Sequence, residues 1–229
     1  MFPLPTVNFP VMPWDFVLII LVLGILIPWR GAARMKRLLA KPELGAADRL
    51  SLYGSTVVFQ WAIAAVVAWR ALARMLSPDE LGLAVFDSWR VASTAIVLTA
   101  LLGINQIVSL RRLAGMPEGK RGSVFAIANQ IIPRTTTETC VYVGLACTAS
   151  VSEEFLYRGF VFAVFARLFA HSGFSSAAAV SLSSAWFSMA HLYQGPRGLL
   201  TTYVVAIIFA LVRIWSGSLI PAVVAHIGY

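Results

Sequence analysis

Long uncharged apolar windows constrain this chain more than any other feature of its sequence. Leu50–Trp69 and Val91–Leu110 each supply the roughly 20 residues that a helix needs to cross a bilayer. Phe16–Trp29 is shorter, but it can be extended through Pro10–Asp15, where Trp14 would lie at the membrane interface. The first half of the chain therefore holds three candidate membrane spans.

The overall composition agrees with these windows. The 229 residues are 59% hydrophobic and only 12% charged, with a mean hydropathy of +0.80, which is outside the usual range of soluble domains. A cleaved signal peptide would also explain the first window, but residues 1–13 carry no Lys or Arg for a positive n-region. We therefore expect an all-α, polytopic transmembrane helical bundle with about six to eight membrane segments.

The net charge of +8 reports topology rather than a nucleic-acid partner. Six basic residues lie between Arg30 and Arg49 and five between Arg111 and Arg134, in connections rather than on a folded basic face. The positive-inside rule places both connections in the cytoplasm and the N-terminus outside. The partner implied is the lipid bilayer, and the Ala- and Arg-rich composition favours a multi-pass protein of the bacterial inner membrane.

Two smaller features carry structural information only. Cys140 and Cys147 would lie about 10 Å apart on one helix, too far for a disulfide, and we interpret them as small apolar core residues. The apolar run Val124–Pro133 is too short to span, which favours a helix lying at the membrane interface.

Ionisable residues interrupt apolar sequence in the second half of the chain. Glu153, Glu154 and Arg158 lie inside one apolar run, and His191 and His226 belong to two further runs. Such residues cost several kcal/mol within a membrane unless they are paired or solvated. They indicate a functional site, and the alternative is a set of structural ion pairs between helices.

The helix face separates the two adjacent carboxylates. Glu154 and Arg158 are one turn apart and can pair, whereas Glu153 is rotated by about 100° and has no cation at its own i+3 or i+4 position. The unpaired carboxylate must find a partner on another helix or take up a proton, which suits a general base. Glu153 is thus the candidate base. The alternative is a structural role, in which Glu153 only hydrogen-bonds to polar groups of a neighbouring helix.

The histidines supply the remaining candidates. Phe187 precedes His191 by four residues and can shield the imidazole, which becomes a plausible partner of Glu153 for a shared water molecule. Ser218 can cap a helix that carries His226 between one and two turns from its start. From there His226 could donate a hydrogen bond to a developing oxyanion.

Together, Glu-Glu-x-x-x-Arg at 153–158, Phe-x-x-x-His at 187–191 and the later His226 resemble the CAAX protease and bacteriocin-processing family of intramembrane glutamate proteases, also called the Abi family. The resemblance covers roughly residues 139–229. It implies that Glu153 and His191 activate water, that His226 helps form the oxyanion hole and that no metal is required. It divides the chain into N-terminal transmembrane helices, residues 1–134, and a catalytic core, residues 135–229.

The resemblance has one departure. The family usually carries Asn or a similar polar residue four positions after the third histidine, whereas this sequence ends at Tyr229. We expect either that the natural chain is longer or that the oxyanion site lacks this donor.

The predicted function is an intramembrane endopeptidase that hydrolyses a peptide or protein substrate in the membrane. One alternative is a zinc metallopeptidase in which Glu153, His191 and His226 supply three ligands and water the fourth. Another is a non-catalytic immunity or scaffold protein that keeps the fold and uses the buried polar cluster for packing.

Overall fold

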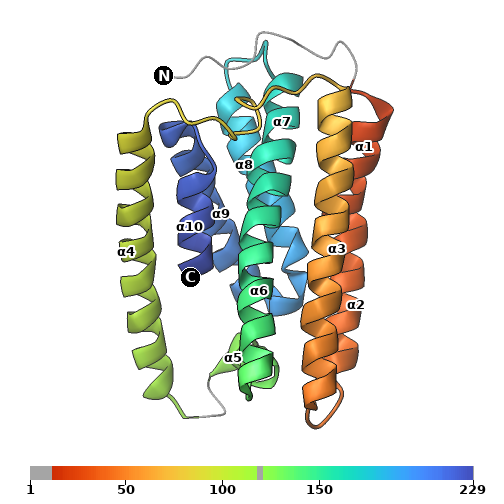
Figure 1. The fold of residues 1–229 in the computed structure, drawn as a ribbon, viewed down its shortest axis with the longest axis vertical. Coiled ribbons are helices and arrows are strands. Elements are labelled where there is room, and N and C mark those ends of the chain that lie inside the picture. The colour runs from red at the N-terminus through yellow and green to blue at the C-terminus, as the bar shows by residue number, and fades with distance from the viewer. Residues whose placement is uncertain (1–11, 118–120, 229) are drawn as a thin grey trace.

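The computed structural model describes residues 12–117 and 121–228, and every regular element in these ranges is helical (Figure 1). The all-α prediction is confirmed. In chain order the elements are α1 (Trp14–Leu21), the π-helical segment η1 (Val22–Leu26), α2 (Ile27–Leu39), α3 (Ala46–Ala73), α4 (Ser88–Ala114), α5 (Gly122–Ile131), α6 (Thr136–Glu153), the π-helical segment η3 (Glu154–Val161), α7 (Phe162–Leu168), α8 (Ser175–Ala190), the 3-10 turn η4 (Leu192–Gln194), α9 (Gly195–Ser216) and α10 (Ile220–Gly228).

Four stretches are long and apolar enough to cross a membrane: Trp14–Leu39, Ala46–Ala73, Ser88–Ala114 and Leu192–Ser216. The first three contain the windows expected from the sequence. The predicted total of six to eight segments is not confirmed, because α8 and α10 are shorter than a span and the run from α6 to α7 carries charged side chains.

Exposed tryptophans lie at one end of the bundle, and the two connections richest in basic residues lie at the other. Trp14, Trp69, Trp89 and Trp215 are all exposed near helix termini at the end where α1 begins (Figure 1). The last turns of α2 and α4 carry the basic residues at the other end. This is the distribution of an aromatic belt and a positive flank. Both basic connections thus meet at one end of the bundle, and their cytoplasmic location and the bacterial inner membrane stay predictions.

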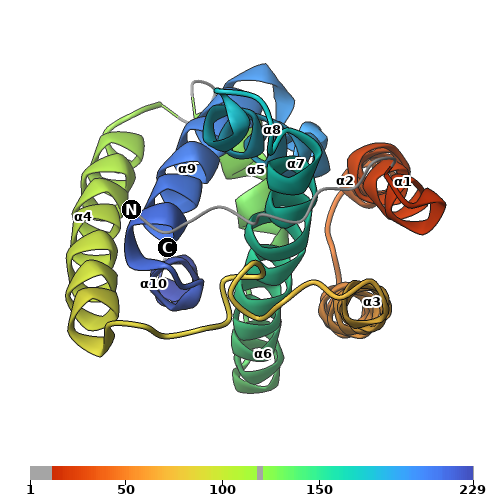
Figure 2. The same ribbon diagram turned by 90° about the horizontal axis from the view of Figure 1, so that it is seen from above.

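The bundle has a central layer with helices on either side (Figure 2). The run from α6 to α8 lies between α1–α3 on one side and α4, α9 and α10 on the other, with α3 packed on α6 and α10 packed on α4. The larger core gathers around η3 and α7, where Phe16, Phe160 and Phe162 are almost completely buried. Lipid tails are as apolar as these side chains, so close packing holds the helices together.

Buried ion pairs join helices that are distant in the sequence. Arg49 of α3 binds Glu138 of α6 through Nε (2.7 Å) and Nη2 (3.1 Å), one nitrogen to each carboxylate oxygen. Arg167 of α7 binds Glu80, in the connection before α4, through Nε (2.5 Å) and Nη2 (2.6 Å) in the same forked manner. Bidentate pairs of this kind combine charge attraction with a defined geometry.

Three local predictions can be compared with the structure. The short helix α5 covers most of Val124–Pro133, and its place at the membrane interface stays a prediction. Ser218 accepts a hydrogen bond from the backbone N–H of Ile220 (3.3 Å), as expected of the residue that caps α10. The prediction that Cys140 and Cys147 lie in the core is wrong, since both are free and exposed on α6. Their small side chains lie on an outer face of α6, which periodicity alone did not distinguish from its inner face.

Candidate active site

The site begins where the α-helix α6 gives way to the π-helical segment η3. The sequence predicted one continuous α-helix here, but the hydrogen-bonding pattern widens from Glu154 to Val161. Such π segments occur often at functional sites. The connection 74–87 crosses this segment closely: a Cβ atom at Gly159 would lie 3.1 Å from the carbonyl oxygen of Leu81, so only glycine leaves full room for the crossing.

The predicted pairing of Glu154 with Arg158 is present. Nη1 of Arg158 lies 3.0 Å from Oε1 of Glu154, and both side chains are completely buried. The guanidinium also lies over the rings of Phe187 (3.9 Å to the centroid) and Phe209 (5.4 Å). Among the described residues, Oε2 of Glu154 and Nε and Nη2 of Arg158 have no hydrogen-bond partner. The cluster thus has one acceptor and two donor atoms that no described protein group binds.

Glu153 finds its partner on another helix. Its Oε1 accepts a hydrogen bond from Nε2 of Gln60 in α3 (2.8 Å), and its side chain is only partly buried. It lies within electrostatic range of Arg158 and His226. The sequence analysis missed Gln60, although one amide in the middle of an apolar span was a usable signal.

His191 follows the last turn of α8. Its Nδ1 lies 3.0 Å from the backbone carbonyl oxygen of Phe187. Because a carbonyl oxygen can only accept, Nδ1 is the donor, and in the neutral ring Nε2 keeps its lone pair. The Phe187 ring packs against the imidazole with centroids 4.7 Å apart, and the centroid of the Tyr193 ring lies 6.0 Å from that of the imidazole. Shielding of His191 from lipid by Phe187 stays a prediction. His191 is therefore arranged to accept a hydrogen bond from water.

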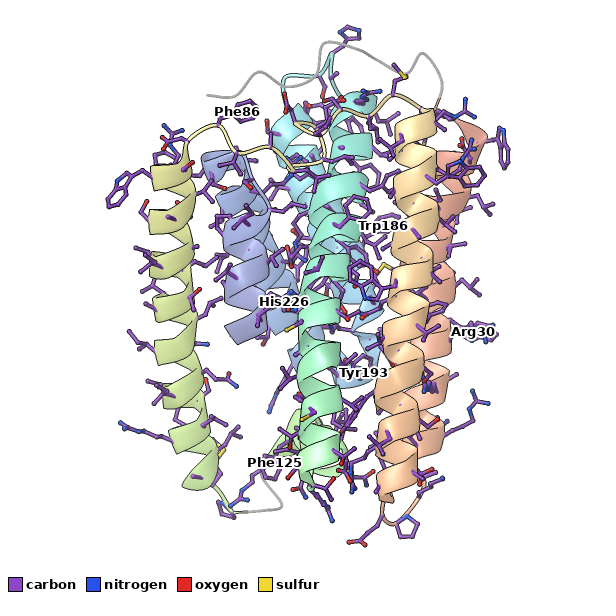
Figure 3. The ribbon with its side chains drawn as sticks, in the orientation of Figure 1. Arg30, Phe86, Phe125, Trp186, Tyr193 and His226 are labelled. Atoms are coloured by element: carbon purple, nitrogen blue, oxygen red, sulfur yellow. The ribbon has the colours of Figure 1, made fainter. Side chains whose placement is uncertain are left out.

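His226 reaches the same cluster from α10, and Figure 3 shows it at mid-height beside α6. Its Nδ1 lies 2.9 Å from Oε1 of Glu154, 72 residues away in the sequence. Its ring also packs against Phe187 (6.2 Å between centroids) and Phe209 (5.9 Å). The contact with Glu154 was not expected, since the sequence analysis paired Glu154 with Arg158 alone.

The Phe187 ring is thus the common neighbour of the predicted site residues. Arg158, His191 and His226 all contact it, from three separate elements. The predicted approach of Glu153 and His191 around one water molecule stays a prediction.

An apolar cavity of about 500 Å³ lies among the helices that carry Gln60, Glu153 and His226, although none of these three residues lines it. Its walls come from α3, the connection before α4, α6 with η3, and α10. Three of its lining residues are close in sequence to site residues: Trp61 follows Gln60, Ser152 precedes Glu153, and Val223 lies one turn before His226. The helices that carry the site residues therefore also line a space that could take an apolar part of a ligand.

The described residues do not form a set of ligands of the kind that the zinc alternative needs. Among the residues that the structure describes, no group of three or more His, Cys, Asp or Glu side chains is placed to hold a metal ion. Glu153, His191 and His226 in particular do not converge as three ligands of one ion.

Comparison with known proteins identifies the C-terminal segment. No curated protein and no solved structure showed significant similarity to the chain. Residues 135–229, somewhat less than half of the chain, match the Rce1-like family described as type II CAAX prenyl endopeptidase. The match begins one residue before α6 and includes all three motifs. Residues 135–229 are therefore a domain of the Rce1-like type II CAAX prenyl endopeptidase family, within the larger family that the motifs indicated.

Proposed function

We propose that this protein is an intramembrane endopeptidase whose catalytic core is residues 135–229. Membership of a family of prenyl endopeptidases supports the general activity. The observation that carries the proposal is the meeting of Arg158, His191 and His226 around Phe187, with Glu153 within electrostatic range of two of them. The substrate class is a peptide or protein segment that reaches this site in the membrane.

In the proposed reaction Glu153 is the general base. Gln60 holds Oε1 of Glu153, which leaves Oε2 to take a proton from a water molecule. The Nε2 atom of His191 accepts the second hydrogen bond of that water and orients it. The water oxygen attacks the peptide carbonyl carbon, and the carbonyl oxygen becomes an oxyanion.

His226 stabilises that oxyanion in this scheme. Its Nδ1 is bound to Glu154, so Nε2 is the nitrogen that donates to the substrate when the ring is protonated on both nitrogens. Collapse of the tetrahedral intermediate breaks the C–N bond, and the proton held by Glu153 passes to the leaving amine. No electron transfer occurs, and the acid product and the amine account for all atoms of the water.

Two observations favour catalysis over the packing alternative. A cluster kept only for packing would be expected to satisfy its buried polar groups, because an unpaired buried polar atom is costly. Here one oxygen of Glu154 and two nitrogens of Arg158 have no partner among the described residues. The cavity of about 500 Å³ also lies among the helices that carry Gln60, Glu153 and His226.

The experiment compares two carboxylates with different assignments. Purified protein in liposomes is incubated with a library of membrane-inserting peptides, and products are read by mass spectrometry. Glu153→Gln should lower cleavage by about 10²-fold or more, since it removes the proton acceptor and keeps the volume. His191→Ala should behave similarly. The matched control Glu43→Gln changes an exposed carboxylate and should cleave like the wild type.

The outcomes separate the three functions. Full activity of Glu153→Gln would contradict its role as the base, and a wild-type protein that cleaves nothing would favour the packing alternative. Chelator treatment with metal analysis tests the zinc alternative. We expect cleavage to survive metal removal, whereas a loss that Zn²⁺ restores would establish a metallopeptidase.

A further inference from the structure

The ion pair between Glu154 and Arg158 differs from the Arg49–Glu138 and Arg167–Glu80 pairs. The two pairs described above are forks in which two nitrogens bind two oxygens. Arg158 instead reaches Glu154 through Nη1 alone, although this pair is the most deeply buried of the three. An arrangement selected only to neutralise a buried guanidinium would favour the fork, which is the stronger geometry.

The explanation lies in what else Oε1 of Glu154 binds. That single oxygen accepts from Nη1 of Arg158 (3.0 Å) and lies 2.9 Å from Nδ1 of His226. A carboxylate turned to form a fork with Arg158 would give up this shared geometry. The orientation of Glu154 thus allows the contact with Nδ1 of His226, and it leaves Nε and Nη2 of Arg158 without a hydrogen-bond partner among the described residues.

Arg158 is itself held by aromatic rings. Its guanidinium lies 3.9 Å from the Phe187 centroid and 5.4 Å from the Phe209 centroid, and the same two rings flank the imidazole of His226. Cation–π contacts are strongest where the cation is removed from water, as it is here. The rings therefore supply part of the stabilisation that a fork would otherwise supply.

We propose that Glu154 is a positioning residue for His226. Its carboxylate accepts the Nδ1–H of His226, which fixes the proton on that nitrogen and turns Nε2 toward the reacting carbonyl. The negative charge also favours the charged ring, in which Nε2 carries the N–H that an oxyanion needs. The other charged groups that interact with the imidazole are Glu153 and Arg158. This inference rests on the proposed function, in which His226 is the oxyanion donor.

The first test reads the position of the proton directly. The chain has three histidines, so ring ¹⁵N labels can be assigned by single substitutions. At alkaline pH, where the rings are neutral, the wild-type spectrum should show His226 protonated at Nδ1. The double variant Glu154→Leu/Arg158→Leu removes both charges together, which avoids an unpaired buried charge. In it, His226 should shift toward protonation at Nε2.

Glu153→Gln is the matched control for this measurement. It changes the neighbouring carboxylate, which is bound to Gln60, and should leave the His226 proton at Nδ1. A His226 ring protonated at Nε2 in the wild type would overturn the positioning role. So would a double variant whose His226 remains protonated at Nδ1.

The second test is kinetic. Glu154→Gln keeps an acceptor oxygen but removes the charge, so kcat should fall by about 10- to 100-fold while KM changes little. A structural defect alone would reduce the amount of folded enzyme without moving the histidine proton. The two failures are distinguishable. If the wild type cleaves peptides but the double variant keeps the His226 proton at Nδ1, the positioning role alone is overturned. If the wild type cleaves nothing but the double variant shows the expected shift of the proton to Nε2, the proposed function is overturned.

Discussion

The close contact between Gly24 and Trp186 gives a sharp test of the packing that supports α8. Gly24 lies in η1, and a Cβ atom there would come within 2.7 Å of Cδ1 and Cε2 of the Trp186 indole and nearer still to Nε1. Figure 3 shows Trp186 inside the bundle. Its Nε1 donates to the carbonyl oxygen of Ile20 (2.9 Å), and its ring meets Phe165 edge to face at 5.4 Å. Gly24→Ala must therefore displace the indole.

The size of the effect follows from these distances. Ordinary contact begins at 3.4 Å, so the ring must retreat by more than 0.7 Å, because Nε1 would lie nearer to the new Cβ atom than the 2.7 Å of Cδ1 and Cε2. A retreat of that size directly away from Ile20 would lengthen the hydrogen bond from 2.9 Å to more than 3.6 Å, beyond useful range. A lost hydrogen bond costs about 0.5–1.5 kcal/mol and overpacking about 1–3 kcal/mol, while alanine recovers about 0.5–1 kcal/mol of helix propensity. The expected net loss is about 2 kcal/mol.

Unfolding in detergent, followed by circular dichroism and tryptophan fluorescence, measures this loss. The matched control is Gly31→Ala, because a Cβ atom at Gly31 meets nothing within 4 Å. The double variant Gly24→Ala/Trp186→Leu should be more stable than the sum of the two single losses predicts, since leucine vacates the contested space. If Gly24→Ala were as stable as Gly31→Ala, the packing argument would be refuted.

Three further predictions concern charge and topology. Glu138→Gln should lower the melting temperature, because it breaks the forked pair with the buried Arg49; an unchanged melting curve would contradict this. Burial raises the pKa of Glu80, but hydrogen bonds and charge from Arg167 outweigh it and hold the pKa below its usual range. The stability from Glu80 is thus complete above the unfolded carboxyl pKa of about 4.3 and is lost as pH falls through the lower folded value, so melting curves of Glu80→Gln should depend less on acid than those of the wild type. A cysteine that replaces Lys36, in a background without native cysteines, should be labelled only from the cytoplasmic face. Labelling from outside would contradict the predicted topology.

Some of the site could be predicted because its members are close in the sequence. Glu154 and Arg158 pair as their spacing of four residues predicted, since neighbouring turns of one helix bring such side chains together. The place of Glu153 on a different face followed from the same periodicity, and of the two outcomes expected for it, a partner on another helix or uptake of a proton, the structure shows the partner. The identity of that partner was not predicted.

The sequence by itself determined the helical class and three of the spans, because a bilayer imposes its length and polarity requirements on each segment separately. The tertiary structure alone decided that Gln60 binds Glu153 across 93 positions and that His226 binds Glu154 across 72. It also decided that the side of α6 that carries Cys140 faces outward. These contacts depend on how helices pack against one another, and in lipid that packing is set by the fit of whole surfaces, which no local periodicity contains.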